Sequence, residues 1–353
     1  MFYLIDENLN LISPIESYKS AIWTTRYYKP GDFELYLPAT TETLNLIKRD
    51  YYLIRDDDFT QAMIIENIQI TTNFEEGNFL TVTGKCLKSI LNRRIIWKQT
   101  TVTGNVETCI RKLITENAIS PTIPERKINN LILGAALGVT DTMNSQYTGD
   151  NLGDVISKIC INYGLGYDIL LDLDEKQFIF ILYKGSDRSY NQSKNPFIVF
   201  SNEFDNLLST NYTNNNENYK NVALVAGEGE GLDRKTFTVG NASDLKRYEL
   251  FVDSRDSSTK GNETMTEDEY NAILSEKGKE ALTETIITES IEGELEPHYT
   301  YKFNRDYFLG DIVEVVNEYG FTMQPQITEV IENEDDSGTN VVVTFETEIE
   351  KEV

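Results

Sequence analysis

The stretch SAIWTTRYYKPGDFELYLP (Ser20–Pro38) contains two strand-like runs on either side of the turn sequence Lys-Pro-Gly-Asp at residues 29–32. In the second run, Phe33, Leu35 and Leu37 alternate with Glu34 and Tyr36. A period of two is typical of a strand that buries one face. The stretch therefore predicts a β-hairpin with one apolar and one polar face.

More strand-like runs follow up to about residue 99, with turn signals at residues 56–58 and 76–77. Two short segments, 41–48 and 85–93, predict helices. Several short strands broken by one or two short helices suggest a small barrel or sandwich. We expect residues 1–99 to form a first β-barrel domain.

The middle of the chain, residues 100–194, changes character. Apolar residues recur at helical spacing after Asn105, a residue suited to cap a helix, and again between Asn151 and Gly164. A hairpin with a turn near residues 174–176 follows. These elements predict an inserted α+β module.

Strands dominate again in residues 195–353, which we expect to form a second barrel of similar topology. One helical island interrupts them: Thr266 and Glu269 have the spacing of a capping box, and the helix should reach about residue 285. We place this helix in an insertion at about 240–295. The expected fold is mainly β, with two barrels bracketing an α+β module.

Composition excludes several classes of function. The chain has 353 residues, 40% of them hydrophobic, with 32 basic and 58 acidic residues and a net charge of −26. Such a chain can bury a core but should repel nucleic acid, because DNA binding requires basic side chains that displace counterions. The start of the chain is not typical of a signal peptide, and no apolar run is long enough to span a membrane.

The segment NVALVAGEGEGLDRK (Asn221–Lys235) raises the question of a phosphate-binding loop. Gly227, Gly229 and Gly231 enclose two glutamates, whose charge would repel phosphate, and a strand rather than a helix is predicted to follow. A hairpin loop that needs positive φ values explains these glycines better. We expect the loop at the edge of a barrel.

Other catalytic or metal-binding patterns are weak. His298 is the only histidine, no nucleophile elbow is present, and the three cysteines are dispersed. The acidic clusters lie in predicted turns and do not match a calcium-binding loop. We therefore predict no catalytic residue, no cofactor, no metal and a structural role for His298.

The last predicted strand carries a row of glutamates. Glu346, Glu348 and Glu350 share one face of the strand, opposite Val343, Phe345 and Ile349. Like charges two residues apart lie about 7 Å from one another along a strand. Such a row is tolerable where it meets water, cations or a basic partner. We expect it to face solvent.

Four segments together resemble the phage tail hub family, the tail-associated (Tal-like) baseplate hub proteins of siphophages. They are YYKPGDFELYLP (residues 27–38), NLGDVISKICINYGLGYDILLDLDEKQFIFILYKGSDRS (151–189), NVALVAGEGEGLDR (221–234) and DYFLGDIVEVVNEYGFTMQPQITEVIE (306–332). The resemblance extends from about residue 20 to residue 350.

This resemblance implies a non-enzymatic virion protein at the tail tip, assembled in the cytoplasm of the bacterial host. Three copies would form a ring of six similar barrels below the distal tail protein. Other implied partners are the tape measure protein and a tip fibre or receptor-binding protein. DNA would pass through the ring without specific binding, and the protein would not insert into a membrane. An acidic lumen would repel the DNA over about a Debye length, roughly 8 Å at physiological salt. The row Glu346, Glu348 and Glu350 is the candidate for that lumen.

Two other functions remain open. A tail-associated peptidase or glycosidase would act on the cell wall, although the sequence offers only generic carboxylates for it. A carbohydrate-binding receptor module would use the aromatic residues of the opening stretch, whose alternation fits a core and an interface better. The chain ends soon after its last predicted strand, so we expect no cell-wall-cleaving extension.

Overall fold

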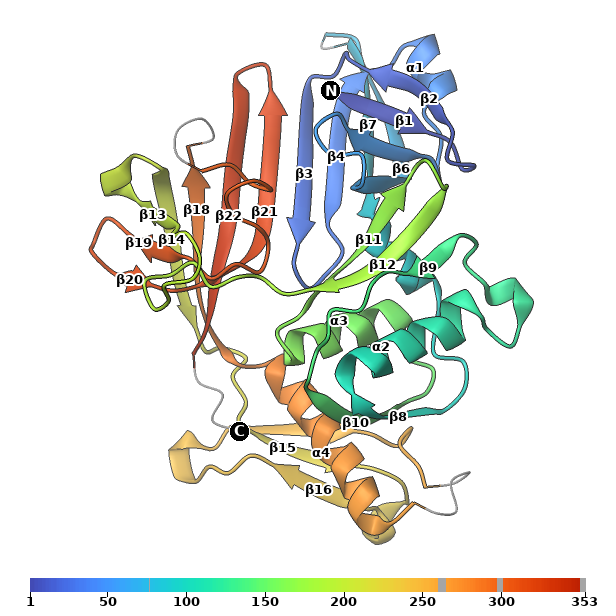
Figure 1. Ribbon diagram of the computed structural model, residues 1–353, viewed down its shortest axis with the longest axis vertical. Coiled ribbons are helices and arrows are strands. Elements are labelled where there is room, and N and C mark those ends of the chain that lie inside the picture. Colours follow the sequence, from blue (N-terminus) through green and yellow to red (C-terminus); the bar gives the residue numbers. More distant parts are fainter. Residues whose placement is uncertain (76, 260–264, 297–300, 350–353) are drawn as a thin grey trace.

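The computed structural model describes residues 1–75, 77–259, 265–296 and 301–349, and they form a mainly β protein. Eleven strands make one large sheet, in the order β14-β18-β22-β21-β3-β4-β7-β6-β5-β1-β2 (Figure 1). Its strands are β1 (Phe2–Ile5), β2 (Leu11–Ile15), β3 (Ser20–Arg26), β4 (Asp32–Pro38), β5 (Tyr52–Arg55), β6 (Ala62–Asn73), β7 (Gly77–Cys86), β14 (Leu207–Asn215), β18 (Ile287–Leu295), β21 (Gln326–Asp335) and β22 (Gly338–Ile349).

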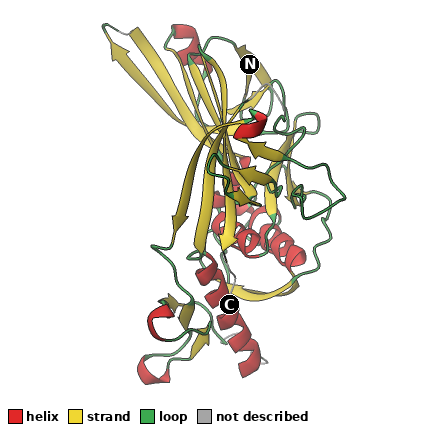
Figure 2. Ribbon diagram, turned by 90° about the vertical axis from the view of Figure 1, so that its left-hand side faces the viewer, coloured by secondary structure: helices red, strands yellow, loops and turns green. Residues whose placement is uncertain are grey.

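The opening hairpin of the sequence forms as expected. Strands β3 and β4 pair with Trp23 opposite Phe33, and the burial of β4 alternates strictly along its length. The short helix α1 (Thr41–Leu46) follows, and Thr40 caps it in a reciprocal pair with Thr43. Figure 2 shows that the long β6–β7 hairpin projects from the body of the molecule at its turn.

The inserted α+β module lies under the N-terminal strands (Figure 1). Asn105 and Asn151 cap its two helices with their side chains, which confirms Asn105 as a helix N-cap. The module contains β8 (Thr100–Asn105), α2 (Val106–Ile114), β9 (Leu131–Leu133), β10 (Thr142–Tyr147), α3 (Leu152–Asn162), β11 (Gly166–Asp172) and β12 (Gln177–Tyr183). Short helices of other types are η1 (Leu87–Arg93), η2 (Thr115–Ile119), η3 (Pro124–Arg126), η4 (Asn202–Phe204), η5 (Gly231–Asp233) and η6 (Asp244–Lys246).

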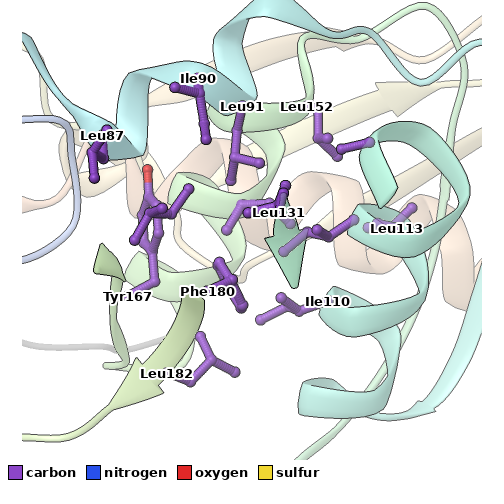
Figure 3. Packing of buried hydrophobic residues seen from close by; sticks show 14 of the residues in the cluster. Leu87, Ile90, Leu91, Ile110, Leu113, Leu131, Leu152, Tyr167, Phe180 and Leu182 are labelled. Carbon is purple, nitrogen blue, oxygen red and sulfur yellow. The ribbon is translucent and has the colours of Figure 1, made fainter. Parts of the chain in front are cut away.

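This module does not have a core of its own. Figure 3 shows its apolar side chains packed together, and the same cluster includes Ile5, Ile54 and Ile64 from the strands of the large sheet. A second cluster packs on one side of the N-terminal strands around Trp23 and Leu35. The N-terminal strands are therefore covered on both faces near β5 and β1.

A second insertion occupies the far end of the molecule. Three strands form a separate sheet in the order β16-β15-β17, and α4 packs on it. Thr266 and Glu269 form the expected capping box at the start of α4. The elements are β15 (Val222–Ala226), β16 (Thr236–Val239), β17 (Glu249–Asp253) and α4 (Glu267–Thr283). The insertion thus lies between β14 and β18, whereas the sequence suggested 240–295, because β15 and β16 look like ordinary barrel strands.

A third small sheet covers the C-terminal strands. It has the order β13-β19-β20 and consists of β13 (Val199–Ser201), β19 (Glu314–Val316) and β20 (Thr322–Met323). Phe200 and Val315 from this sheet pack against Phe345 and Ile291 of the large sheet. Each half of the large sheet therefore has its own apolar cover.

The three parts of the chain meet at Tyr27, which is fully buried. Its hydroxyl donates to the carbonyl of Gly164 at 3.3 Å and accepts from the N–H of Gly185 at 3.4 Å. Gly310, at φ +87°, packs on its ring so closely that a Cβ there would lie 2.3 Å from the ring. Any other residue at position 310 would therefore force a large local shift of the backbone or of the Tyr27 ring.

The expected closed barrels do not form within the described residues. The two halves instead join edge to edge through β21 and β3, and β14 and β2 stand at the two ends of an open, curved sheet. All three cysteines are buried and free. Among the described residues, no helix is long and apolar enough to cross a membrane.

Candidate functional site

The large sheet contains two four-strand units with the same strand order. In the N-terminal unit the spatial order is β3-β4-β7-β6, and in the C-terminal unit it is β14-β18-β22-β21. Numbered along the chain within each unit, both orders are first, second, fourth, third. The two units follow one another head to tail.

A β-bulge aligns the two units residue by residue. The third strand of each unit has one extra residue opposite the fourth strand, between Ile65 and Asn67 in β6 and between Ile327 and Glu329 in β21. Bulges are conserved features of a strand pair rather than defects. From this anchor, the ladders place Trp23 of β3 in the position that Tyr212 has in β14.

The joint between the units is held by charge as well as by backbone pairing. Strands β21 and β3 are antiparallel, with Glu332 opposite Trp23. The guanidinium of Arg26 in β3 bridges Glu329 of β21 and Asp32 of β4. Burial opposes the charge of Arg26, but the two carboxylates nevertheless raise its pKa. The joint thus has partly buried ion pairs, which salt screens less than exposed ones.

The two faces of this eight-strand band differ in character. One face carries the apolar clusters described above, and the opposite face is mainly polar, with most side chains exposed or half-buried. Glu34 and Glu292, which occupy equivalent positions in the two units, are both exposed on it. Acidic residues outnumber basic ones there: Asp32, Glu34, Glu292, Glu294, Glu329 and Glu346 against Arg26 and Lys85. We call this surface the acidic face.

The structure describes only part of the predicted glutamate row. Glu346 is exposed and lies on the acidic face, while Val343 and Phe345 are buried on the other side of β22. Glu350 lies outside the described residues, as does the side chain of Glu348. Glu346 is at the rim of a recess of about 1090 Å³ between the sheet and the helices α3 and α4. Sequence reasoning missed Glu292 on this face, although Glu34 showed the alternation that identifies such positions.

Two strand edges of the band have no partner strand among the described residues. The outer edge of β14 is one, since β14 ends the sheet. The other is the outer part of β6, because β5 pairs only with Ala62–Ile64. Both edges lack proline, and Glu66 is the only charged residue in the two segments 66–73 and 207–215. By contrast, the edge strand β2 contains Pro14, which protects an edge from further pairing.

The glycine loop lies in the β15–β16 hairpin of the second insertion, away from the large sheet where it was expected. Gly229 and Gly231 have φ values of +99° and +57°, which confirms the expected positive φ at these two glycines but not at Gly227. A Cβ on Gly227 would lie 2.2 Å from the hydroxyl of Tyr270 in α4. The loop therefore needs glycine for its turns and for close packing on the helix.

The glutamate of this loop has a structural use. Glu228 accepts hydrogen bonds from the N–H of Thr259 at 2.9 Å and from the Ser258 hydroxyl at 2.9 Å, and it pairs with Lys235 at 2.9 Å. Burial opposes its ionisation, but these donors hold the pKa of Glu228 at about 2. A carboxylate so fully used cannot assist in binding phosphate.

Nothing in the described residues resembles a metal or catalytic centre. No group of three or more His, Cys, Asp and Glu side chains is placed to hold a metal ion there. His298 lies outside the described residues. A smaller cavity of about 400 Å³ lies where the module meets both halves of the sheet, and Lys88 and Asp311 are among the residues that line it.

Two charged groups of this cavity, Lys88 and Asp311, already have partners. Lys88 donates to the carbonyl of Arg26 at 2.5 Å, and Asp311 pairs with Arg188 at 2.6 Å. The first contact lies within the N-terminal part, and the second ties the module to the C-terminal half. The acidic face and the two free edges therefore remain the features with the best claim to function.

Comparison with known proteins agrees with the fold. Residues 1–345 match the model of a family described as Siphovirus ReqiPepy6 Gp37-like protein. No curated protein matches the chain by sequence.

The solved structures similar to the chain include three tail proteins. The tail protein from Neisseria meningitidis MC58 has a TM-score of 0.59 at 13% identity, covering 98% of this chain and 96% of that chain. The prophage MuSo2 43 kDa tail protein from Shewanella oneidensis has a TM-score of 0.57 at 12% identity, covering 98% and 97%. Prophage tail protein gp18 from Listeria monocytogenes EGD-e has a TM-score of 0.50 at 10% identity, covering 100% and 95%. At these identities the likeness concerns the fold.

Proposed function

The chain belongs to the Siphovirus ReqiPepy6 Gp37-like family and has the fold of phage tail proteins, and on this basis we propose that it is the structural hub of a phage tail tip. Three copies would form a ring that joins the tail tube to the tip and lets DNA pass. The ring would sit below the distal tail protein and contact the tape measure protein, and a tip fibre or receptor-binding protein would attach to it. The protein would act in the virion after assembly in the host cytoplasm.

The observation that carries this proposal is the head-to-tail duplication. One joint between the units lies inside the chain, where β21, the third strand of one unit, pairs with β3, the first strand of the other. The two free edges lie on β6 and β14, which are the third and first strands left without such a pairing. Repetition of such a heterologous contact closes into a ring when the rotation allows. With three copies, six units would line the channel, which matches sixfold symmetry in a tube above it.

The acidic face supplies the chemistry of a passage. It would line the channel, with Glu34, Glu292 and Glu346 turned toward DNA and with Glu348 and Glu350 continuing the row. Carboxylates repel a polyanion, so the wall would not retain the passing DNA. The apolar clusters on the other face would lie between the channel wall and the outer modules.

The mass of the purified protein in solution tests the proposal. We expect a concentration-dependent trimer in native mass spectrometry, with a mass three times 40.4 kDa. Antibody labelling of phage particles should place the protein at the end of the tail. A protein that is monomeric at every concentration and absent from tail tips would contradict the proposal.

The same preparation separates the rival functions. Loss of turbidity of a purified cell-wall suspension would favour a peptidase or glycosidase. Selective binding on a glycan array would favour a carbohydrate-binding module. The hub predicts neither signal.

A further inference from the structure

The joint inside the chain specifies a register that can be transferred to the free edges. Within the chain, Ile331 of β21 lies opposite Thr24 of β3, and Glu332 lies opposite Trp23. The pairing is antiparallel and continues from Glu329 to Asp335. Each residue at this joint has an equivalent at one of the free edges.

The equivalent positions follow from the ladders. The bulges place Gln69, Ile70 and Thr71 of β6 where β21 has Ile331, Glu332 and Asn333. The first strands are aligned through their partners in the second and fourth strands: Asn211, Tyr212 and Thr213 of β14 occupy the positions of Ile22, Trp23 and Thr24 of β3.

We propose that β6 of one copy pairs antiparallel with β14 of the next copy in this same register, so that Ile70 lies opposite Tyr212. Thr71 then lies opposite Asn211, and Thr72 opposite Thr210. This inference rests on the proposed ring and adds to it the strands, the direction and the residue pairs of the contact between copies. The occupant of both free edges is thus a second copy of this chain.

The exposure of the apolar pair supports the register. Ile70 and Tyr212 point to the apolar side of the band, where their cross-strand partners Leu80 and Ile291 are fully buried. Nevertheless Ile70 is 55% exposed and Tyr212 is 41% exposed, whereas Trp23, the equivalent of Tyr212 at the internal joint, is 4% exposed. Two apolar side chains left open at matching positions gain from mutual burial.

The surroundings of Tyr212 extend the apolar contact. Phe321 stacks on the Tyr212 ring with a centroid distance of 6.2 Å and is itself 61% exposed. Leu208 on the same strand is 50% exposed. An aromatic pair beside the unpaired outer edge of β14 gives a docking surface with both backbone hydrogen bonds and apolar area, the combination used in strand addition.

The opposite side of the proposed joint is polar in both strands. Gln69 and Thr71 of β6 would stand beside Thr213 and Asn211 of β14. These uncharged side chains fit a joint that continues the acidic face without adding repulsion between copies. Neither strand presents lysine or proline at these positions, so nothing guards the edges against pairing.

Paired cysteines test the register directly. The native cysteines are buried and should not interfere. We expect Thr71→Cys with Asn211→Cys, or Thr72→Cys with Thr210→Cys, to produce disulfide-linked dimers and trimers under mild oxidation. Residue pairs along an antiparallel ladder alternate between a shorter and a longer Cα–Cα distance, and a disulfide forms only within a narrow range of that distance. Two neighbouring pairs are therefore tested, so that one of them has a suitable distance.

The matched control is Asn67→Cys with Asn211→Cys. It uses the same strands and the same face, but its cysteines would be about 13 Å out of register. We expect it to form at least tenfold less linked product than the better of the two in-register pairs. Efficient linkage in the control, or none in either in-register pair while the protein is trimeric, would overturn the register and leave the ring standing.

A second measurement follows the strength of the contact. Ile70→Asp and Tyr212→Asp should weaken the trimer at least tenfold in mass photometry without lowering the midpoint of thermal unfolding of the monomer, because both side chains are exposed there. Leu245→Asp, at a 94% exposed site in the second insertion, is the control and should leave the trimer unchanged. Unchanged trimers in both edge variants would also contradict the register, whereas a wild-type protein that never assembles, alone or in tails, would contradict the proposed function itself.

Discussion

Gly185 and Gly310 approach so closely that a Cβ on Gly185 would lie 1.9 Å from the carbonyl carbon of Gly310. This contact joins the end of the α+β module to the segment that leads into the C-terminal half of the sheet. The carbonyl carbon and the carbonyl oxygen of Gly310 are the two nearest atoms, and both belong to the backbone. No side chain can therefore move to make room.

We therefore expect Gly185→Ala to lower the free energy of unfolding by more than about 2 kcal/mol, as changes that force a backbone shift in a packed site commonly do. Chemical denaturation measures this loss. Gly149→Ala is the control: Gly149 has φ +80° but nothing within 4 Å, so the strain of its backbone alone should cost about 1 kcal/mol. Equal losses in the two variants would contradict the close approach.

Asp311 is the second tie at this junction. Its carboxylate accepts from the Nε of Arg188 at 2.6 Å and from the backbone N–H groups of Ser186 at 2.7 Å and Phe308 at 3.0 Å, and the residue is 2% exposed. Asp311→Asn leaves a largely buried guanidinium without its carboxylate, which should cost about 3 to 5 kcal/mol of unfolding free energy.

The control for Asp311→Asn is Glu249→Gln, which breaks the exposed pair of Glu249 with Arg247. An exposed pair contributes at most about 1 kcal/mol. Denaturant midpoints of the two variants should therefore differ clearly. A neutral Asp311→Asn variant would show that the junction does not depend on this charge.

The contact of α4 with the α+β module should depend on pH. Glu280 accepts a hydrogen bond from the hydroxyl of Tyr147 at 2.5 Å, and burial raises the pKa of the Glu280 carboxyl, while Lys277, Tyr147 and Lys158 oppose the shift. An acid whose pKa is raised on folding adds stability below its unfolded pKa and loses it as the pH rises through the folded pKa.

Glu280→Gln keeps an oxygen that can accept from Tyr147 but removes the charge. We expect this variant to have a higher thermal unfolding midpoint than the wild type at about pH 8 and nearly the same midpoint at about pH 4, where the wild-type carboxyl is protonated. Glu276→Gln, on the same helix and bonded to Tyr163 at 2.7 Å, is the control. A wild-type protein with a higher unfolding midpoint than Glu280→Gln at about pH 8 would show that the pKa of Glu280 is not raised on folding.

The acidic face predicts an effect on DNA passage. Replacing Glu34, Glu292 and Glu346 with lysine changes only exposed side chains, so the fold and the assembly of particles should persist. DNA ejection triggered in solution should slow or stall, because a cationic wall would hold the polyanion. Replacing Asp57, Glu175 and Glu249, which are exposed elsewhere, by lysine controls for net charge. Equal ejection rates in both variants would argue against a channel on this face.

Local patterns predicted the elements better than their partners. The alternation around Phe33 and Leu35 gave strand β4 and its buried face, and the Thr266–Glu269 spacing gave the start of α4. The boundary of the second insertion was missed because β15 has the composition of any buried strand, and only its pairing with β17 separates it from the large sheet.

The open sheet has a similar explanation. Whether a curved sheet closes on itself depends on which edges meet, and no residue of β3 signals that its partner is β21. Of the candidate site, Glu346 could be assigned from its alternation to the polar face of its strand. The acidic face as a whole became visible only when Glu34 and Glu292 were brought into equivalent positions by two ladders.

The joint between β21 and β3 has a consequence for how the chain is made. Thr25 and Val330, which are paired across it, are 305 residues apart, so β3 leaves the ribosome long before its partner exists. At a synthesis rate of about 5 to 20 residues per second, the wait is about 15 to 60 s. During that interval the edge of β3 is open to any other nascent chain. Mispairing of β3 is therefore most probable on polysomes that carry many unfinished chains. A lower level of its mRNA should give more soluble product.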